Sequence, residues 1–285
     1  MVMRPAWSWQ FDEEHLKVPV TQALLDEITS EWACAGSTGA GVRVAIIDSG
    51  VEQNHPAVQG AVHGWVEPIE GPNGYTFNEA PHTDAYGHGT ALAGIIHGLA
   101  PDAQIYSVKV LGAGLTGRAQ TLAAGLRWAI DHDMHVANLS LGLTKREYYG
   151  LFHELADDAY FHNLILVTAA NNMPVPTYPA QYASVVSVAS QIDLNPEHFA
   201  YNPSPPVDFG APGINVRVAW LQGGYITATG NSYAAPHMTG HVCRVLSKHP
   251  GLVPYQVKTI LRSMSSNMQR QITEDAETAE RSGIR

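Results

Sequence analysis

The sequence contains little cysteine, little positive charge and no long apolar run. Its 285 residues include only Cys34 and Cys243, too few for a disulfide framework and typical of free buried thiols. The 16 lysines and arginines face 26 acidic residues, a formal net charge of −10, so the basic face of a nucleic-acid-binding protein is not expected. No segment approaches about 18 consecutive apolar residues, so no membrane-spanning helix is expected. Nothing in the composition indicates an oligomeric state.

The first residues, MVMRPAWSWQFDEEHLK, lack the apolar centre of a secretory signal. The sequence as written therefore predicts a cytoplasmic protein. We expect residues 1–20 to form an N-terminal extension, residues 21–268 to form one domain and residues 269–285 to form a polar tail.

Short β-branched apolar runs alternate with helical patterns along most of the chain. This alternation predicts an α/β fold with three layers (αβα), in which a mostly parallel central sheet is covered by helices on both faces. The expected strands are 42–48, 103–111, 135–141, 164–170, 184–190 and 206–213, with a hairpin over about 215–228. The expected helices are 21–34, 88–99, 118–132, 146–162 and 254–264, and a further helix opens at Ser232.

Asp48 ends the apolar segment VAIID, so it is expected at the carboxyl edge of a buried strand, where α/β proteins place functional sites. An aspartate there could instead cap a helix or bind a ribose. A dinucleotide-binding loop is not indicated, because the glycines of GSTGAG precede the strand and would have to follow it.

His88 and Ser232 lie in two glycine-containing segments, YGHGT and GNSYAAP. The glycines beside His88 allow close backbone approach, although a lone histidine is usually a satisfied polar group. Ser232 is expected at the start of a helix, where the helix dipole favours a developing negative charge. Pro236 is expected in the first turn, where its missing N–H costs little. The alternative role for Ser232 is a plain helix cap.

The three residues occur in the order Asp, His, Ser. An acid such as Asp48 can fix the tautomer of an imidazole, which can then remove the proton of a serine hydroxyl. An esterase of the α/β-hydrolase type would need the motif G-x-S-x-G and the order Ser, Asp, His, and the chain has neither.

The segments VAIIDSG, YGHGT and GNSYAAP resemble the motifs of the subtilisin-like (S8) serine peptidases, the subtilases. The connecting segments YSVKVLGAGLTGR, LRWAIDHDMHVANLSLG, LVTAANN, YPAQYASVVSVAS and DFGAPG match in kind and order, so the resemblance runs from about Ala35 to Met264. It implies a subtilisin-like fold and a serine endopeptidase that acts through an acyl-enzyme.

The resemblance also implies a role for each matching residue. Asp48 would orient His88, His88 would act as general base and then as acid, and Ser232 would attack the carbonyl carbon. Asn172 in AANNM matches the oxyanion-hole asparagine of the family, with Asn171 in place of a usual glycine. An extended peptide or protein substrate would be bound by Leu115, Thr116, Gly117, Ser140, Leu141 and Gly142. The first pocket would be lined by Ser140–Gly142, by Ala169 and Ala170 and by the segment Met173–Tyr178, and Met173 and Thr177 lead us to expect it to be apolar and of moderate size.

The chain departs from the family pattern in several places. The segment GIIHGLAPDAQIY lacks the loop that supplies calcium ligands in many subtilisins, so we expect no such site and no cofactor. Asn231 stands for a usual threonine and Tyr233 for a common methionine, and neither change removes a catalytic group. Residues 1–20 could lie across the cleft as an inhibitory strap or form a tail.

Two further functional interpretations stay open at this point. A processing protease for a small biosynthetic precursor peptide is indicated by the lack of a recognisable leader and prodomain in the sequence. A catalytically silent peptide-binding protein is the alternative. The presence of all the catalytic residue types disfavours it, because binding a peptide requires none of them together.

Overall fold

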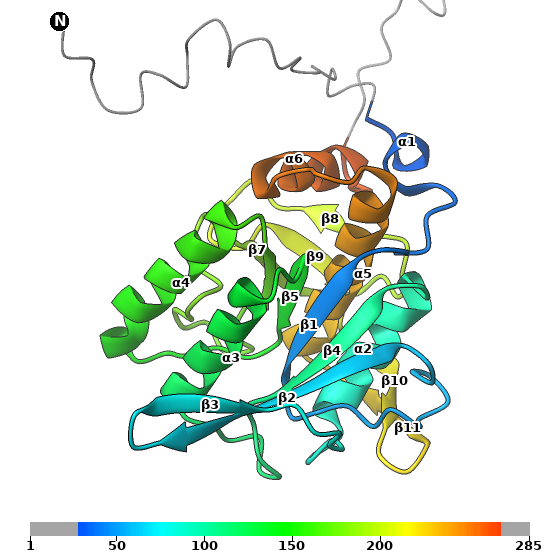
Figure 1. Cartoon of the computed structure of the whole chain (residues 1–285). Helices are drawn as coiled ribbons and strands as arrows, with labels where there is room; N and C mark the ends of the chain where they lie inside the picture. Colours follow the sequence, from blue (N-terminus) through cyan, green and yellow to red (C-terminus); the bar gives the residue numbers. More distant parts are fainter. Residues whose placement is uncertain (1–27, 269–285) are drawn as a thin grey trace, which may run out of the picture.

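A nine-stranded sheet forms the centre of the molecule in the computed structural model, which describes residues 28–268 (Figure 1). The strand order is β3-β2-β4-β1-β5-β6-β7-β9-β8. The pairs at the two ends, β2 with β3 and β8 with β9, are antiparallel, and all pairs between them are parallel. The predicted mostly parallel sheet is therefore confirmed. The strands are β1 (Arg43–Asp48), β2 (Val62–Gly71), β3 (Gly74–Asn78), β4 (Gln104–Lys109), β5 (Val136–Leu139), β6 (Ile165–Ala169), β7 (Val186–Gln191), β8 (Ala200–Tyr201) and β9 (Phe209–Pro212).

Helices cover both faces of this sheet, as the three-layer prediction requires. Successive residues of β1 point to opposite faces. Val44 and Ile46 belong to a buried cluster with residues of α2 and α5, whereas Ala45 and Ile47 belong to a second cluster with residues of α3 and α4. The helices are α1 (Ser30–Cys34), α2 (His88–Leu99), α3 (Ala119–Asp131), α4 (Tyr149–Phe161), α5 (Asn231–Lys248) and α6 (Pro254–Met264).

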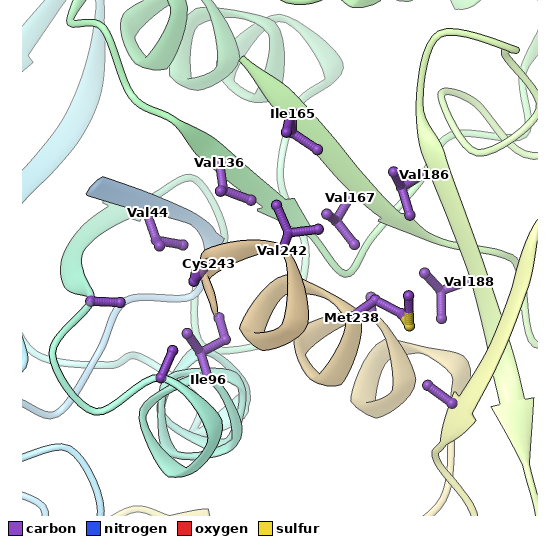
Figure 2. Close-up of a cluster of buried hydrophobic side chains, with 14 of the residues drawn as sticks. Val44, Ile96, Val136, Ile165, Val167, Val186, Val188, Met238, Val242 and Cys243 are labelled. Atoms are coloured by element: carbon purple, nitrogen blue, oxygen red, sulfur yellow. The ribbon is translucent and has the colours of Figure 1, made fainter. Parts of the chain in front are cut away.

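Helix α5 lies within the first cluster. Its residues Met238, Val242 and Cys243 pack among the valines and isoleucines of the sheet (Figure 2). Cys243 and Cys34 are both buried and unpaired, which confirms the prediction of free thiols. Apolar burial holds α5 against the sheet, and the residues of its first turn are therefore held in position.

Most predicted elements have nearly the predicted bounds, and the 215–228 hairpin is present as β10 (Val216–Trp220) and β11 (Gly224–Ala228). The N-terminal helix is shorter than predicted within the described residues. Residues 28 and 29 are not helical, because the Thr29 hydroxyl accepts the backbone N–H of Trp32 and caps a helix that begins at Ser30.

The strands β2 and β3 were not predicted. They form an antiparallel hairpin at one end of the sheet, in which Pro68 pairs with Phe77 and Ile69 with Thr76. Many of its side chains are exposed on both faces, so the sequence carries no clear alternation of buried and exposed residues there.

The predicted start of α5 and the predicted place of Pro236 are wrong. The helix begins at Asn231, one residue before Ser232, with Gly230 as its N-cap residue. Pro236 is therefore the sixth residue of the helix and lies in its second turn. An interior proline removes the N–H that would bond to the carbonyl four residues earlier, and in α5 that carbonyl belongs to Ser232.

The predicted extension (residues 1–20), most of the predicted 21–34 helix and the predicted tail (residues 269–285) lie outside the described residues. No helix between residues 28 and 268 has both the length and the hydropathy that crossing a membrane requires.

Candidate active site

Asp48 and His88 meet at the carboxyl end of the central strand. Asp48 is the last residue of β1 and is fully buried, and His88 is the first residue of α2. The His88 Nδ1 and Asp48 Oδ1 atoms are 2.8 Å apart. The backbone N–H of Ser49 donates to the same carboxylate oxygen. This contact leaves Nε2 as the ring nitrogen of His88 that does not contact the acid. Because the Asp48 carboxylate is already bound to His88, the alternative roles of Asp48 in ribose binding and helix capping are not supported.

Opposing effects act on the pKa of His88. Burial by itself would lower the pKa, but the charge of Asp48, the hydrogen bond to it and the charge of Asp84 act in the other direction. The result is a pKa above the usual 6.5. The site therefore stabilises an imidazolium, which is the form that a histidine takes after it has accepted a proton.

Asp84 is a site residue that the sequence analysis missed. Its buried carboxylate accepts five hydrogen bonds, from the Ser49 hydroxyl, the backbone N–H groups of Tyr86 and Gly87, and both the N–H and the hydroxyl of Thr90. These bonds fix the turn that leads into α2. The available sequence signal was an aspartate that begins a glycine-containing turn directly before a helix.

Ser232 and Asn172 lie beside the same glycine. A Cβ atom on Gly230 would be 3.3 Å from Ser232 Oγ and 3.5 Å from Asn172 Nδ2. The backbone N–H of Asn231 donates to Asn172 Oδ1 at 2.8 Å, which orients the amide and leaves its Nδ2 hydrogens free to donate. Ser232 makes no side-chain cap contact at the start of α5, so the plain helix-cap alternative is not supported.

Asn171 faces away from this arrangement. Its Oδ1 accepts the backbone N–H of Met173, two residues further along the same loop. Asn231 Nδ2 donates to the carbonyls of Ala170 and Asn171, and Asn231 Oδ1 accepts the N–H of Ser190. The asparagine that replaces a threonine in the serine motif thus ties the start of α5 to the end of β6.

His88 contacts Tyr233, the residue that follows Ser232 in α5. The rings of His88 and Tyr233 are in edge contact, with centroids 5.6 Å apart. No hydrogen bond joins His88 Nε2 to Ser232 Oγ among residues 28–268, and such bonds are often long when no substrate is bound.

The predicted substrate-binding residues form three groups, two of which follow strands next to β1. Leu115 to Gly117 follow β4, and Ser140 to Gly142 follow β5. Since these strands flank β1 on its two sides, the two segments lie on either side of Asp48. Neither segment is part of the lining of the cavity described next, although Ser140–Gly142 were predicted to line the first pocket.

A cavity of about 280 Å³ lies beside the loop that follows β6. Ala170, Met173 and Thr177 of the predicted pocket all line it. The cavity also connects to the second substrate segment, because Gly142 packs against Thr177. Its wall is mostly apolar and partly exposed, and Met173 is 66% accessible. Its lining residues are Ala170, Asn171, Met173, Pro174, Val175, Pro176, Thr177, Ala180, Gln181, Pro206 and Val207.

Within residues 28–268, no group of three or more histidines, cysteines, aspartates and glutamates is placed to hold a metal ion. The connection between α2 and β4 consists of residues 100–103 alone.

Comparisons with known proteins agree with this geometry. The model of the "Subtilase family" matches residues 39–280. Subtilisin Savinase from Lederbergia lenta is 32% identical over 244 residues, which cover 82% of this chain and 86% of that protein. An alkaline protease from Alkalihalobacillus alcalophilus is also 32% identical, but the chain covers only 61% of its length. Among solved structures, the S41 psychrophilic protease has a TM-score of 0.69 at 28% identity, covering 80% of this chain and 84% of that one.

A second solved structure, a cold adapted subtilisin-like serine proteinase, has a TM-score of 0.67 at 27% identity and covers 87% of this chain and 95% of that one.

The comparisons contradict the cytoplasmic location expected from the sequence. Another relative, 32% identical over 249 residues, is the minor extracellular protease Epr of Bacillus subtilis; the match covers 83% of this chain and 36% of that protein. The cytoplasmic expectation depended on N-terminal residues alone, and these lie outside the described part of the chain.

Proposed function

The chain belongs to the subtilase family and is a serine endopeptidase, and we propose that Asp48, His88 and Ser232 are its catalytic triad. The observation that carries the proposal is the buried 2.8 Å contact between His88 Nδ1 and Asp48 Oδ1. It assigns Nε2 as the atom that exchanges protons with Ser232 and the substrate. The silent peptide-binding alternative is set aside, since the chain is an enzyme.

The proposed reaction has two stages. Ser232 Oγ attacks the scissile carbonyl carbon and transfers its proton to His88 Nε2, and the imidazolium is stabilised by Asp48. His88 then gives this proton to the leaving amine as the C–N bond breaks, which leaves an acyl-enzyme on Ser232. In the second stage water attacks the ester carbonyl and gives a proton to His88, and the acyl C–O bond then breaks as His88 returns this proton to Ser232 Oγ.

Asn172 is proposed to stabilise the negative oxygen of each tetrahedral intermediate. Its Nδ2 group lies beside Gly230 together with Ser232 Oγ, and the backbone N–H of Ser232 would supply the second donor. Removing an oxyanion-hole donor costs about 10²–10³ in kcat. Asn172→Ala is expected to show such a loss, and Asn171→Ala, whose amide serves its own loop, is the matched control.

The proposed substrate is an extended peptide segment of a protein. It would add as a strand between residues 115–117 and 140–142, with backbone hydrogen bonds for affinity and side-chain pockets for selectivity. The side chain before the scissile bond would enter the cavity lined by Ala170, Met173 and Thr177, whose apolar wall favours an apolar residue. A precursor-processing role stays a prediction, and the genomic neighbourhood of the coding sequence tests it.

The proposal includes no calcium site between α2 and β4, because the four connecting residues offer too few oxygens for a cage of about six to eight ligands. If calcium bound there, a free calcium concentration of 100 times the Kd would add about 2.7 kcal/mol to the free energy of unfolding. We therefore expect Tm to be the same with and without a calcium chelator, and a fall in Tm would contradict this part.

A serine-directed fluorophosphonate tests the proposal as a whole. The wild-type protein is expected to gain one adduct, located on Ser232 by peptide mass spectrometry. Its peptidase activity should fall in proportion to the fraction of protein that carries the adduct. Ser232→Ala is expected to gain none and to be inactive. Ser247→Ala, which changes a serine near the far end of the same helix, is the control. A fully labelled but active enzyme, or an active Ser232→Ala variant, would refute the assignment.

A further inference from the structure

The proline inside α5 leaves the carbonyl group of the proposed nucleophile without its helical partner. In a regular helix the N–H of residue 236 would donate to the carbonyl oxygen of Ser232. Pro236 has no N–H and lies inside the helix. A carbonyl that is partly buried and lacks a donor costs free energy, so another donor is expected nearby.

Ser140 supplies that donor from a different part of the fold. Its hydroxyl donates to the carbonyl oxygen of Ser232 at 2.8 Å, across 92 positions of sequence. Ser140 itself is buried, directly after β5. A serine hydroxyl has a single proton, so this proton is not available to a substrate.

A buried chain of polar groups fixes the Ser140 hydroxyl in turn. Asn138 Nδ2 donates to Ser140 Oγ at 3.0 Å, which leaves the hydroxyl proton for Ser232. The hydroxyl of Thr239, on α5, donates to Asn138 Oδ1 at 2.9 Å. Asn138 and Thr239 are both fully buried. Each of these side-chain oxygens has a partner, and the Thr239 hydroxyl is closer to Asn138 Oδ1 than to its other acceptor, the Ala235 carbonyl at 3.2 Å.

We propose that Ser140 is a positioning residue that substitutes for the helical N–H lost at Pro236 and holds the peptide group of Ser232 in place. The inference rests on the proposed function, in which Ser232 supplies both the nucleophilic Oγ and one oxyanion donor. Both groups are attached to the residue whose carbonyl Ser140 holds. Fixing that carbonyl therefore limits the motion of both groups relative to His88 and Asn172.

This role predicts an effect on the chemical step and none on substrate binding. Ser140→Ala removes one neutral hydrogen bond and is expected to lower kcat about tenfold with KM changed less than twofold. The rate constant for fluorophosphonate inactivation should fall by the same factor, because it reports attack by Ser232 without a peptide substrate. Ser140→Thr keeps the hydroxyl and should retain at least a third of wild-type kcat.

A double-mutant cycle with Pro236→Ala separates positioning from a general structural effect. Alanine at 236 restores the N–H that can donate to the Ser232 carbonyl, so the Ser140 hydroxyl becomes dispensable. In this background Ser140→Ala should lower kcat less than twofold. Ser247→Ala is the matched control, since it also removes a serine bond to a backbone carbonyl but at the far end of α5.

Each outcome has a defined meaning. Two results would overturn the inference. One is that Ser140→Ala lowers kcat by the same factor in the wild-type and Pro236→Ala backgrounds. The other is that Ser140→Ala in the wild-type background has a kcat within twofold of wild type. If Pro236→Ala does not fold, Ser140→Thr decides, and a threonine variant as slow as the alanine variant would overturn it. An active Ser232→Ala variant would instead end the proposed function, whatever Ser140→Ala does.

Discussion

Two histidines in this molecule are buried to a similar extent but have different partners at Nδ1. His88 begins α2 and is 7% exposed, and His237 lies in α5 and is 5% exposed. Each makes a 2.8 Å contact through Nδ1, His88 with the carboxylate of Asp48 and His237 with the backbone carbonyl of Tyr233. The depth of burial, the ring atom and the distance are nearly the same.

The difference in partner reverses the effect on the pKa. For His237, burial lowers the pKa to about 4, and the bond to the carbonyl recovers only part of the loss. For His88, burial is again the largest single effect and acts in the same direction, but the charge of Asp48, the hydrogen bond to it and the charge of Asp84 together outweigh it, so the pKa is raised. A buried histidine is thus by default a poor proton acceptor, and a buried carboxylate converts it into one that suits general-base catalysis.

The largest expected effect on activity comes from removing the charged partner of His88, so that His88, like His237, has only a neutral partner at Nδ1. Asp48→Asn keeps the shape of the side chain but removes the charge and allows the wrong tautomer of His88. We expect kcat to fall by about 10⁴, measured with an excess of a chromogenic peptide substrate.

Asp193 provides the matched control for this change. It makes a contact of 2.8 Å with Nδ1 of His198, but both side chains are about half exposed. Asp193→Asn should leave kcat within about twofold of wild type. If Asp48→Asn were as active as Asp193→Asn, the pairing of Asp48 with His88 would have no catalytic role.

A smaller effect concerns stability at acidic pH. His237 and its neighbour His241 both have pKa values of about 4 in the folded protein, against 6.5 for an unperturbed histidine. Between these pH values the unfolded chain binds more protons than the folded one, so the free energy of unfolding falls as the pH falls. Either histidine alone would contribute about 3 kcal/mol to this loss by pH 4. His88 acts in the opposite sense, because its raised pKa adds stability below pH 6.5 that is lost as the pH rises through the folded pKa.

Chemical denaturation between pH 7 and pH 4 measures this loss. In His237→Gln the non-titrating amide should make the decrease smaller, even if the variant is less stable at pH 7. His198→Gln, which replaces a half-exposed histidine, is the control. A His237→Gln curve parallel to that of the wild type would contradict the account.

The smallest expected effect concerns the second acid near His88. The charge of Asp84 also raises the pKa of His88, so the acid limb of the profile of kcat/KM against pH should have its midpoint above 6.5 in the wild type. In Asp84→Asn the midpoint should move to lower pH, while kcat at alkaline pH falls no more than about threefold. An unmoved midpoint in folded Asp84→Asn would remove Asp84 from the electrostatics of the site.

The fold was largely predictable because local sequence patterns determine most of its elements. Helices α2 and α6 have the predicted bounds, since Gly87 precedes the first and Pro254 begins the second. The β2–β3 hairpin was not predicted, because exposed strands at the end of a sheet carry a weak pattern.

The site was predictable where a motif carries it and not where distant segments meet. Asp48, His88, Asn172 and Ser232 were predicted from short motifs, and the structure pairs Asp48 with His88 and places Asn172 beside Ser232. The network around Asp84 and the bond from Ser140 to the Ser232 carbonyl were missed. The second of these joins residues 92 positions apart, and no local sequence pattern indicates such a contact.

Trapping the acyl-enzyme tests the central claim most directly. The wild-type enzyme is mixed with an activated ester substrate and quenched in acid within the first turnover, and its peptides are analysed by mass spectrometry. We expect a single acyl group on the peptide that contains Ser232, and much less of it in Asp48→Asn. An acyl group on another residue, or turnover with no acyl group on Ser232, would contradict the account.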